Sequence, residues 1–155
     1  MEIGHLFLWG FAATLILTSI MVGAKYFGLT RMDLPFLVGT LFTNSRDKAT
    51  GIGFAVHLTF GWVFAFIYGF AFETSAIQTW WFGSLIGLVH AAFVLTAGLQ
   101  ILTSIHPRMA KSHQGPTPTR LLEPPGFLAL NYGAGTPLAT AIAHLVYGGV
   151  LGAFY

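Results

Sequence analysis

The sequence predicts an all-α membrane protein, a bundle of four transmembrane helices that forms one domain over residues 1–155. Three observations carry this prediction: few charged residues, four long apolar stretches, and basic residues confined to two connections. Of the 155 residues, 55% are hydrophobic and 8% are charged, and the mean hydropathy is +0.72. Soluble domains carry about 25% charged residues. Most of the surface of this chain must therefore face lipid.

The apolar stretches define the spans. A helix needs about 20 apolar residues to cross a bilayer core roughly 30 Å thick. We expect the four spans at about residues 3–24, 51–72, 79–103 and 136–155. Pro137 falls in the first turn of the last span, where its missing N–H costs no helical hydrogen bond. Only Glu2 precedes the first span, which lacks the basic start of a signal peptide, so we expect that span to be retained.

The basic residues indicate the orientation of the chain. They flank or lie in the first and third connections: Lys25, Arg31, Arg46, Lys48, Arg108, Lys111 and Arg120. The positive-inside rule makes that side cytoplasmic, so we expect an inner-membrane protein with both termini on the non-cytoplasmic side. The aromatic belt at the outer interface would consist of Tyr68, Trp80, Trp81 and Tyr155.

Each basic connection also carries a short apolar stretch behind an acid and a proline. Asp33-Leu34-Pro35 leads into FLVGTLF, and Glu123-Pro124-Pro125 leads into GFLALNY. Runs of this length are too short to span, and they typically lie in the interface or re-enter between helices. We expect interfacial segments here on the cytoplasmic side, the first capped by Asp33 with Pro35 in its first turn. The polar stretch 106–118 predicts an exposed loop.

The sequence also indicates a tandem duplication of a two-helix unit, with halves at residues 1–72 and 79–155. Aligning His57 with His144 brings GFAVHLTFGWVFAFIY against TAIAHLVYGGVLGAFY, in which His, Leu, Gly, Val and Tyr coincide. Upstream, LTRMD at Leu29 parallels HPRMA at His106. Each half has an even number of spans, so the copies would run parallel, related by a pseudo-twofold axis along the membrane normal. Chance similarity between two apolar helices is the alternative.

Small residues recur at every fourth position on the second and fourth spans, on the same faces as His57 and His144. These stripes include Gly53, Gly61, Gly148 and Gly152. Stripes of small residues let helix backbones approach closely in lipid. We therefore predict that these glycines lie at close helix contacts or beside a cofactor.

Three histidines within the spans are the candidate site residues: His57, His90 and His144. An ionisable residue in a span marks a functional site by default, because it is costly to bury. In one interpretation, neutral imidazoles only hydrogen-bond neighbouring helices and hold the bundle together. In a second, His57 and His144 axially ligate a tetrapyrrole, either haem b or chlorophyll. In a third, the histidines bind a metal ion or relay protons, with His90 as the deepest group.

Several motifs carry a resemblance over nearly the whole chain: TRMDLPFLVGTLFT, GFAVHLTFGW, HPRMA, LEPPGFLALNYG and TPLATAIAHLVYG. Together they resemble a group of small bacterial membrane proteins with four helices and no assigned activity. The resemblance implies the four-helix topology, and it implies no functional residue.

Composition narrows the function. The absence of cysteine excludes disulfides, iron–sulfur clusters and thiolate-bound zinc. The basic residues are too few and too dispersed for nucleic acid, and no nucleophile–base pair or phosphate loop predicts independent catalysis. We expect an accessory or cofactor-holding subunit of a larger respiratory or photosynthetic complex, in contact with lipid and with other membrane subunits or further copies of itself. The alternatives are a self-contained haem b electron-transfer protein using His57 and His144, and a small oligomeric transporter or channel.

Overall fold

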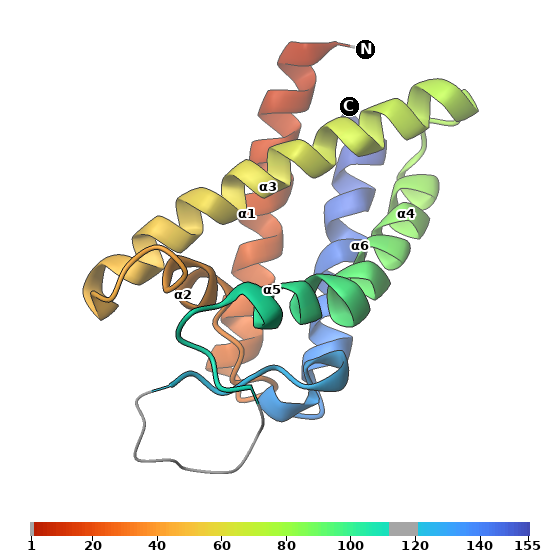
Figure 1. Cartoon of the computed structure of the whole chain (residues 1–155). Coiled ribbons are helices and arrows are strands. Elements are labelled where there is room, and N and C mark those ends of the chain that lie inside the picture. Colours follow the sequence, from red (N-terminus) through yellow and green to blue (C-terminus); the bar gives the residue numbers. More distant parts are fainter. Residues whose placement is uncertain (1, 112–120) are drawn as a thin grey trace.

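The computed structural model describes residues 2–111 and 121–155, and this part of the chain is helical without named strands. Its four long apolar helical segments are candidate membrane spans, which confirms the predicted all-α four-helix bundle. They are α1 (Ile3–Tyr26), α3 (Arg46–Ser75), the α4–α5 segment (Trp80–Ile105) and α6 (Thr136–Phe154). The start of α1 and the end of α6 lie at the same end of the bundle, away from the connection between α5 and α6 (Figure 1).

The second and third spans differ from their predicted form. α3 begins at Arg46 and ends at Ser75, so it includes charged residues at which the expected span stops. Helical hydrogen bonding does not depend on apolar side chains, so a helix can continue past the apolar stretch that marks a span. The third span consists of α4 (Trp80–Phe93), a π-helical turn at Val94–Gly98 and α5 (Leu99–Ile105). Such π-helical turns occur frequently at functional sites.

The two short apolar stretches fold differently from each other. The first forms α2 (Leu34–Gly39), and an Asp33 carboxylate oxygen accepts the Phe36 N–H at 3.1 Å, which confirms the predicted cap. The second forms η2 (Phe127–Tyr132), a 3₁₀ helix interrupted by left-handed residues at Leu128 and Ala129, with φ of 52° and 59°. The polar stretch 106–118 is described only up to residue 111, and its remainder lies outside the described residues.

Glycines mark the places where helix backbones touch. A Cβ on Gly148 would fall on the backbone oxygen of Gly83, and a Cβ on Gly152 would fall on that of Thr79. α4 and α6 therefore pack backbone against backbone. α2 and α3 do the same at Gly53, where a Cβ would fall on the carbonyl oxygen of Pro35.

Two arginines connect the halves that the repeat relates. Arg31 donates to the Asn131 carbonyl oxygen in η2, and its guanidinium lies 3.1 Å from a Glu123 carboxylate oxygen. Arg108 donates to the carbonyl oxygen of Thr40 at the end of α2 and to the side chain of Asn44. Arg31, in the first half, thus binds η2 of the second half, and Arg108, in the second half, binds the end of α2 in the first half. This reciprocity is what a duplication would produce, and the duplication itself stays a prediction.

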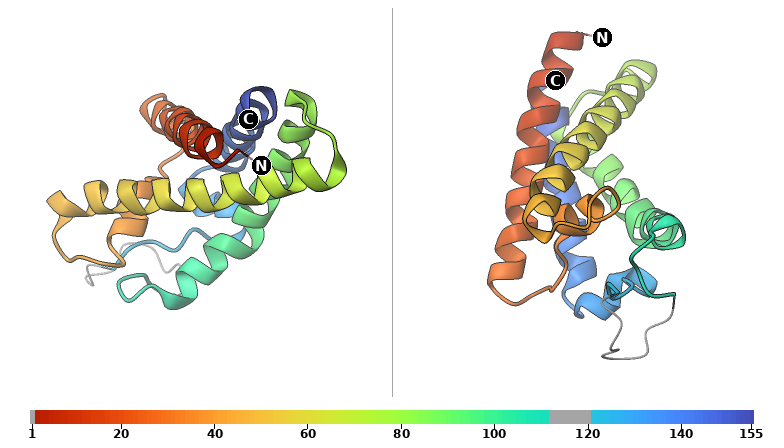
Figure 2. Two further views of the ribbon diagram at one scale, coloured as in Figure 1. Left: turned by 90° about the horizontal axis from the view of Figure 1, so that it is seen from above. Right: turned by 60° about the vertical axis from the view of Figure 1, so that its left-hand side comes forward.

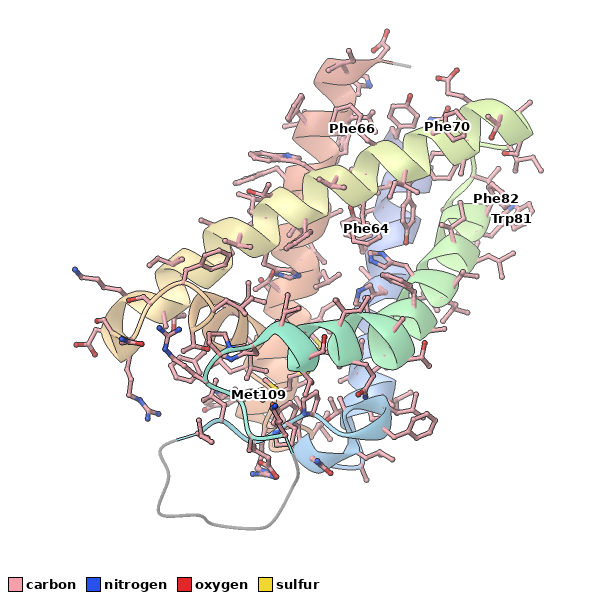
Figure 3. All side chains as sticks on the ribbon, viewed as in Figure 1. Phe64, Phe66, Phe70, Trp81, Phe82 and Met109 are labelled. Carbon is pink, nitrogen blue, oxygen red and sulfur yellow. The ribbon has the colours of Figure 1, made fainter. Side chains whose placement is uncertain are left out.

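One aromatic residue is not where the sequence places it. Trp80 and Trp81 are exposed near the connection between α3 and α4, and Figure 3 marks Trp81 beside Phe82 in that region. Tyr68 is only 1% exposed, so its assignment to a lipid-facing belt is wrong. Its ring points into the bundle because α3 turns this face toward α6, where Tyr68 contacts Tyr147 edge to face.

The arrangement of the second and third spans creates a cavity. α3 and the α4–α5 segment meet at their connection, residues 76–79, and diverge from there (Figure 2). α1 and α6 lie behind this gap. A cavity remains between the diverging helices because no other described helix fills it.

Candidate functional site

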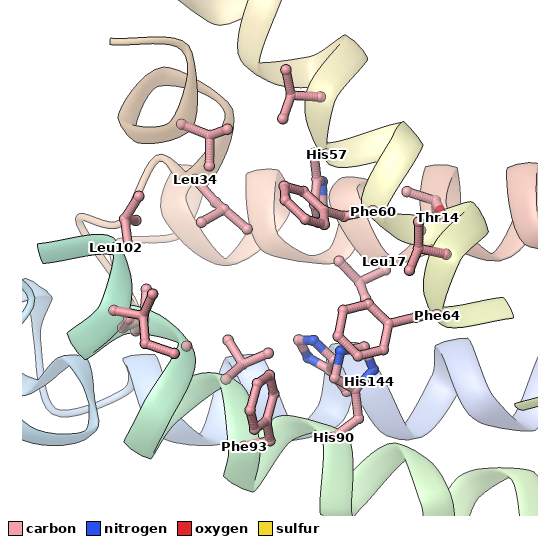
Figure 4. Close-up of a pocket in the computed structure, with 18 of the residues that line it drawn as sticks. Thr14, Leu17, Leu34, His57, Phe60, Phe64, His90, Phe93, Leu102 and His144 are labelled. Carbon is pink, nitrogen blue, oxygen red and sulfur yellow. The ribbon is translucent and has the colours of Figure 1, made fainter. Parts of the chain in front are cut away.

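The cavity between α3 and the α4–α5 segment has a volume of about 540 Å³, within the usual range of small-molecule sites, roughly 300–1,000 Å³. Its lining is overwhelmingly apolar. The polar side chains among the described lining residues are Thr14, His57, His90, His144 and Tyr147 (Figure 4). None of the described lining residues is an acid, a lysine or an arginine. The cavity therefore suits an uncharged, mostly apolar molecule with a small polar part.

All three predicted histidines line this one cavity. His57 comes from α3, His90 from α4 and His144 from α6. The rings of His90 and His144 contact each other, with centroids 4.6 Å apart and planes at 80°. His57 lies across the cavity from this pair (Figure 4). The sequence relates His57 to His144 by the repeat, whereas the structure places His90 beside His144.

The protonation of His144 follows from its hydrogen bond. Its Nδ1 lies 2.8 Å from the carbonyl oxygen of Thr140 in the same helix. A carbonyl oxygen only accepts, so Nδ1 carries the proton and Nε2 keeps a free lone pair. Among the described residues, no side chain or backbone group pairs with this Nε2. Because its bond stays within α6, His144 does not simply hold two helices together.

His57 adopts the same tautomer for a different reason. Its Nδ1 lies 3.3 Å from Oγ1 of Thr18 in α1. The Thr18 hydroxyl donates its only proton to the carbonyl oxygen of Thr14, at 2.7 Å. The Thr18 oxygen must therefore accept from His57 Nδ1, which again leaves the Nε2 lone pair free. This bond does join α1 to α3, so His57 also contributes to packing.

His90 differs from the other two imidazoles because its tautomer is not fixed. Its ring stacks on Phe64, with centroids 3.7 Å apart, and its Nδ1 lies 3.4 Å from the Tyr68 hydroxyl. A hydroxyl can donate or accept. Nε2 of His90 can therefore be either a donor or an acceptor, depending on how the Tyr68 hydroxyl is turned.

Two tyrosines belong to this site, Tyr147 as a lining residue and Tyr68 through its contact with His90, and the sequence patterns did not single out either for it. Tyr147 donates its hydroxyl to the carbonyl oxygen of Gly61 at 2.6 Å, which ties α6 to α3. Tyr68 contacts His90 as described above. Spacing could have identified them: Tyr68 lies about three helical turns after His57, and Tyr147 about one turn after His144, so each shares a face with a histidine.

His106 provides a contrast within the same protein. Its Nε2 donates to the Leu37 carbonyl oxygen at 3.1 Å, and its Nδ1 accepts the Arg108 N–H at 3.1 Å. Both ring nitrogens of this buried histidine are occupied, as expected of a structural residue. His57 and His144 each keep one nitrogen free.

The rim of the cavity is apolar and exposed. Phe60 and Val63 on α3 are 53% and 50% exposed, and Phe93 and Ile101 on the facing segment are 47% and 54% exposed. In a bilayer these side chains would contact lipid tails. The cavity therefore opens toward the lipid-facing surface of the bundle.

The histidine nitrogens of the cavity suit some of the cofactors expected from the sequence, a metal ion, haem b or chlorophyll, better than others. The described residues contain no group of three histidine or acidic side chains placed to hold a metal ion. The free Nε2 atoms fit axial ligation of a tetrapyrrole, because ligating histidines usually donate their other nitrogen to a protein oxygen. The fit is incomplete for haem b, since the described lining supplies no cation for its propionates.

One buried polar atom lies beside this site. Oγ1 of Thr140, one turn before His144, is the only fully enclosed side-chain oxygen or nitrogen in the described part of the chain without a hydrogen-bond partner. The free Nε2 atoms of His57 and His144 differ from it because they belong to residues that line the open cavity. Its backbone carbonyl is the acceptor that fixes the tautomer of His144.

Comparison of the chain with family models, with curated proteins and with solved structures finds no match. The resemblance noted in the sequence therefore stays a prediction. The site itself carries the functional argument.

Proposed function

We propose that this chain is a multi-pass protein of the cell membrane that holds a lipid-soluble cofactor between α3 and the α4–α5 segment. One observation carries the proposal: the free Nε2 atoms of His57 and His144 belong to an uncharged, apolar cavity that opens toward lipid. A polar group that faces an apolar cavity without a partner costs free energy. A bound molecule that pairs with these nitrogens would recover that cost.

A tetrapyrrole is one candidate for this cofactor. His57 and His144 have the tautomer that axial ligation requires, and the phenylalanine-rich lining suits a flat macrocycle. The missing counter-charge for propionates favours a tetrapyrrole without free carboxylates, such as chlorophyll, over haem b.

The experiment compares the purified wild-type protein with a His57→Ala/His144→Ala double variant and a His5→Ala control. His5 is exposed and lies near the start of α1, away from the cavity. We expect organic extraction, absorption spectroscopy and mass spectrometry to find a lipid-soluble molecule in the wild type and the control but not in the double variant. Identical bound molecules in all three proteins would refute the proposal.

Binding a cofactor without catalysing a reaction is typical of a subunit of a larger membrane complex. Four of the helical segments are candidate spans, and most of the described chain lies within them. Extraction in mild detergent should recover stoichiometric membrane partners. Recovery as a lone species with its cofactor would instead favour the self-contained electron-transfer protein.

We also propose that the connection between α1 and α3 faces the cytoplasm, in line with the positive-inside rule. Because the chain has no cysteine, single cysteines report topology cleanly. In intact cells a membrane-impermeant maleimide should label Gln78→Cys, between α3 and α4, and spare Lys48→Cys at the other end of α3. The reverse pattern would invert the proposed orientation.

A further inference from the structure

We infer that the cavity binds a neutral lipid with a hydroxylated aromatic ring, of the hydroquinone class, whose hydroxyl groups donate to Nε2 of His57 and His144. This inference rests on the proposed function and names the chemical class of the occupant. It follows from three properties of the lining: its hydrogen-bond polarity, its charge and its aromatic content.

The first property is that the fixed polar groups can only accept. Thr18 and the Thr140 carbonyl hold the Nδ1 protons of His57 and His144, so both free nitrogens present lone pairs. The Tyr147 hydroxyl proton is already given to Gly61. A matching ligand must therefore supply donors, which a hydroquinone has and the corresponding quinone lacks.

The second property is the absence of charge among the described lining residues. A carboxylate or phosphate brought into this cavity would lose its hydration without meeting a cation, at a cost of several kcal/mol or more. This excludes fatty acids and phospholipid headgroups as good ligands. A phenolic hydroxyl is neutral below a pH of about 10, so it enters without this cost.

The third property is the aromatic lining. Phe60 on α3 lies across the cavity from Phe93 on α4 (Figure 4). Phe64, also on α3, stacks on His90, and its ring centroid lies 6.4 Å from that of Phe93. Aromatic rings pair favourably in stacked or edge-to-face arrangements. Phe60 and Phe93 also lie at the exposed rim, so the hydrocarbon tail of a ring-bearing lipid can remain among the lipid tails while its ring lies inside.

His90 gives the site one adaptable contact. Because the Tyr68 hydroxyl can reverse its role, His90 can donate to a carbonyl oxygen as well as accept from a hydroxyl. The oxidised quinone would thus keep one partner, His90, whereas the two hydroxyl groups of the hydroquinone donate to both His57 and His144. We therefore expect both forms to bind, with the reduced form preferred.

The test measures binding to the full-length protein in detergent, by calorimetric titration under anaerobic conditions. The probes are a benzohydroquinone with a ten-carbon alkyl chain and its oxidised quinone. We expect the hydroquinone to bind about tenfold more tightly, the effect of one or two net hydrogen bonds. His57→Phe keeps a planar ring and removes the acceptor, so it should reduce this preference several-fold, while His5→Ala should leave it unchanged.

The outcomes separate this inference from the proposed function. Equal affinity for the two probes, or a preference that His57→Phe does not reduce, overturns the hydroxyl assignment. Failure of both probes to bind, together with a tetrapyrrole spectrum that depends on His57, overturns the hydroquinone class and leaves the proposed function standing. If neither probe binds and no molecule co-purifies, both the inference and the proposed function fail. Size-exclusion profiles that match the wild type show that each variant is folded.

Discussion

The two helix pairs of this protein use small residues in different ways. Between α4 and α6, Gly83 and Gly148 bring backbone against backbone. Between α1 and α3, Gly61 meets the side chain of Thr14 instead, and Gly10 meets the methyl group of Ala65. The α4–α6 pair therefore packs without intervening side chains, whereas side chains separate α1 from α3.

This difference bears on the position of the cavity. The repeat aligns Ala65 with Gly152, and a Cβ at position 152 would fall on backbone, whereas Ala65 carries one. α3 thus packs less closely on α1 than α6 packs on α4. At its other end α3 packs on α2, where Gly53 contacts backbone. The space between α3 and the α4–α5 segment stays open. His57 and His144 occupy positions related by the repeat, and both line this space. Only His57 also joins two helices, through its bond to Thr18.

The largest expected effect tests the α4–α6 contact. Gly148→Ala places a Cβ on the backbone of α4, and the helices must separate to accept it. Overpacking of this kind costs about 1–3 kcal/mol or more. We expect a marked loss of thermal stability in detergent, measured by circular dichroism.

The matched control for this change is Gly51→Ala in α3, where a Cβ meets nothing within 4 Å. It should be neutral or slightly stabilising, because alanine favours helix over glycine by up to about 1 kcal/mol. Gly61→Ala should fall between the two, since the Thr14 side chain can move. If Gly61→Ala destabilises more than Gly148→Ala, the contrast between the helix pairs is wrong.

The next effect compares the two arginines. Arg108 is half-buried and donates to the Thr40 carbonyl oxygen and to Asn44, so Arg108→Ala should cost about 1.5–3 kcal/mol. Arg31 is exposed, so its pair with Glu123 contributes about 0–1 kcal/mol and its bond to the Asn131 carbonyl oxygen competes with water. Arg31→Ala should therefore cost less. Urea unfolding of both variants in the same detergent measures the difference, and equal losses would show that the two contacts are equivalent.

The smallest effect concerns the unpaired hydroxyl beside His144. Thr140→Val replaces a buried oxygen without a partner by a methyl group, so we expect stability to stay the same or rise by about 1 kcal/mol. Thr136→Val is the control, because the Thr136 hydroxyl bonds Thr30 at 2.7 Å and its loss should destabilise. A clear loss of stability in Thr140→Val would mean that its hydroxyl has a partner.

Sequence patterns predicted the spans and the Asp33 cap because these depend on local properties: apolar length and a carboxylate before a helix start. They could not predict that His90 meets His144. α4 turns a face of small residues inward, including Gly83, Gly87 and Ala91, but its sequence does not indicate which helix that face meets. The burial of Tyr68 was missed for a related reason, since a tyrosine near a span end is equally typical of a lipid interface.

The cavity was also beyond sequence analysis. It depends on the angle at which α3 and the α4–α5 segment diverge, and this angle follows from contacts far apart in the chain, such as Gly53 against Pro35. The histidines themselves stood out, because an ionisable residue in a span is unusual. Their free nitrogens became visible only with the positions of Thr18 and Thr140.

The central claim is that a lipid-open, water-free cavity separates α3 from the α4–α5 segment. Spin labels on single cysteines in lipid bilayers test it most directly, with Val94→Cys inside the cavity and Val89→Cys, 66% exposed, as the lipid-facing reference. The account predicts that oxygen relaxes the label at 94 nearly as strongly as at 89 and that a water-soluble nickel complex reaches neither. A label at 94 shielded from both reagents, or open to the nickel complex, would contradict it.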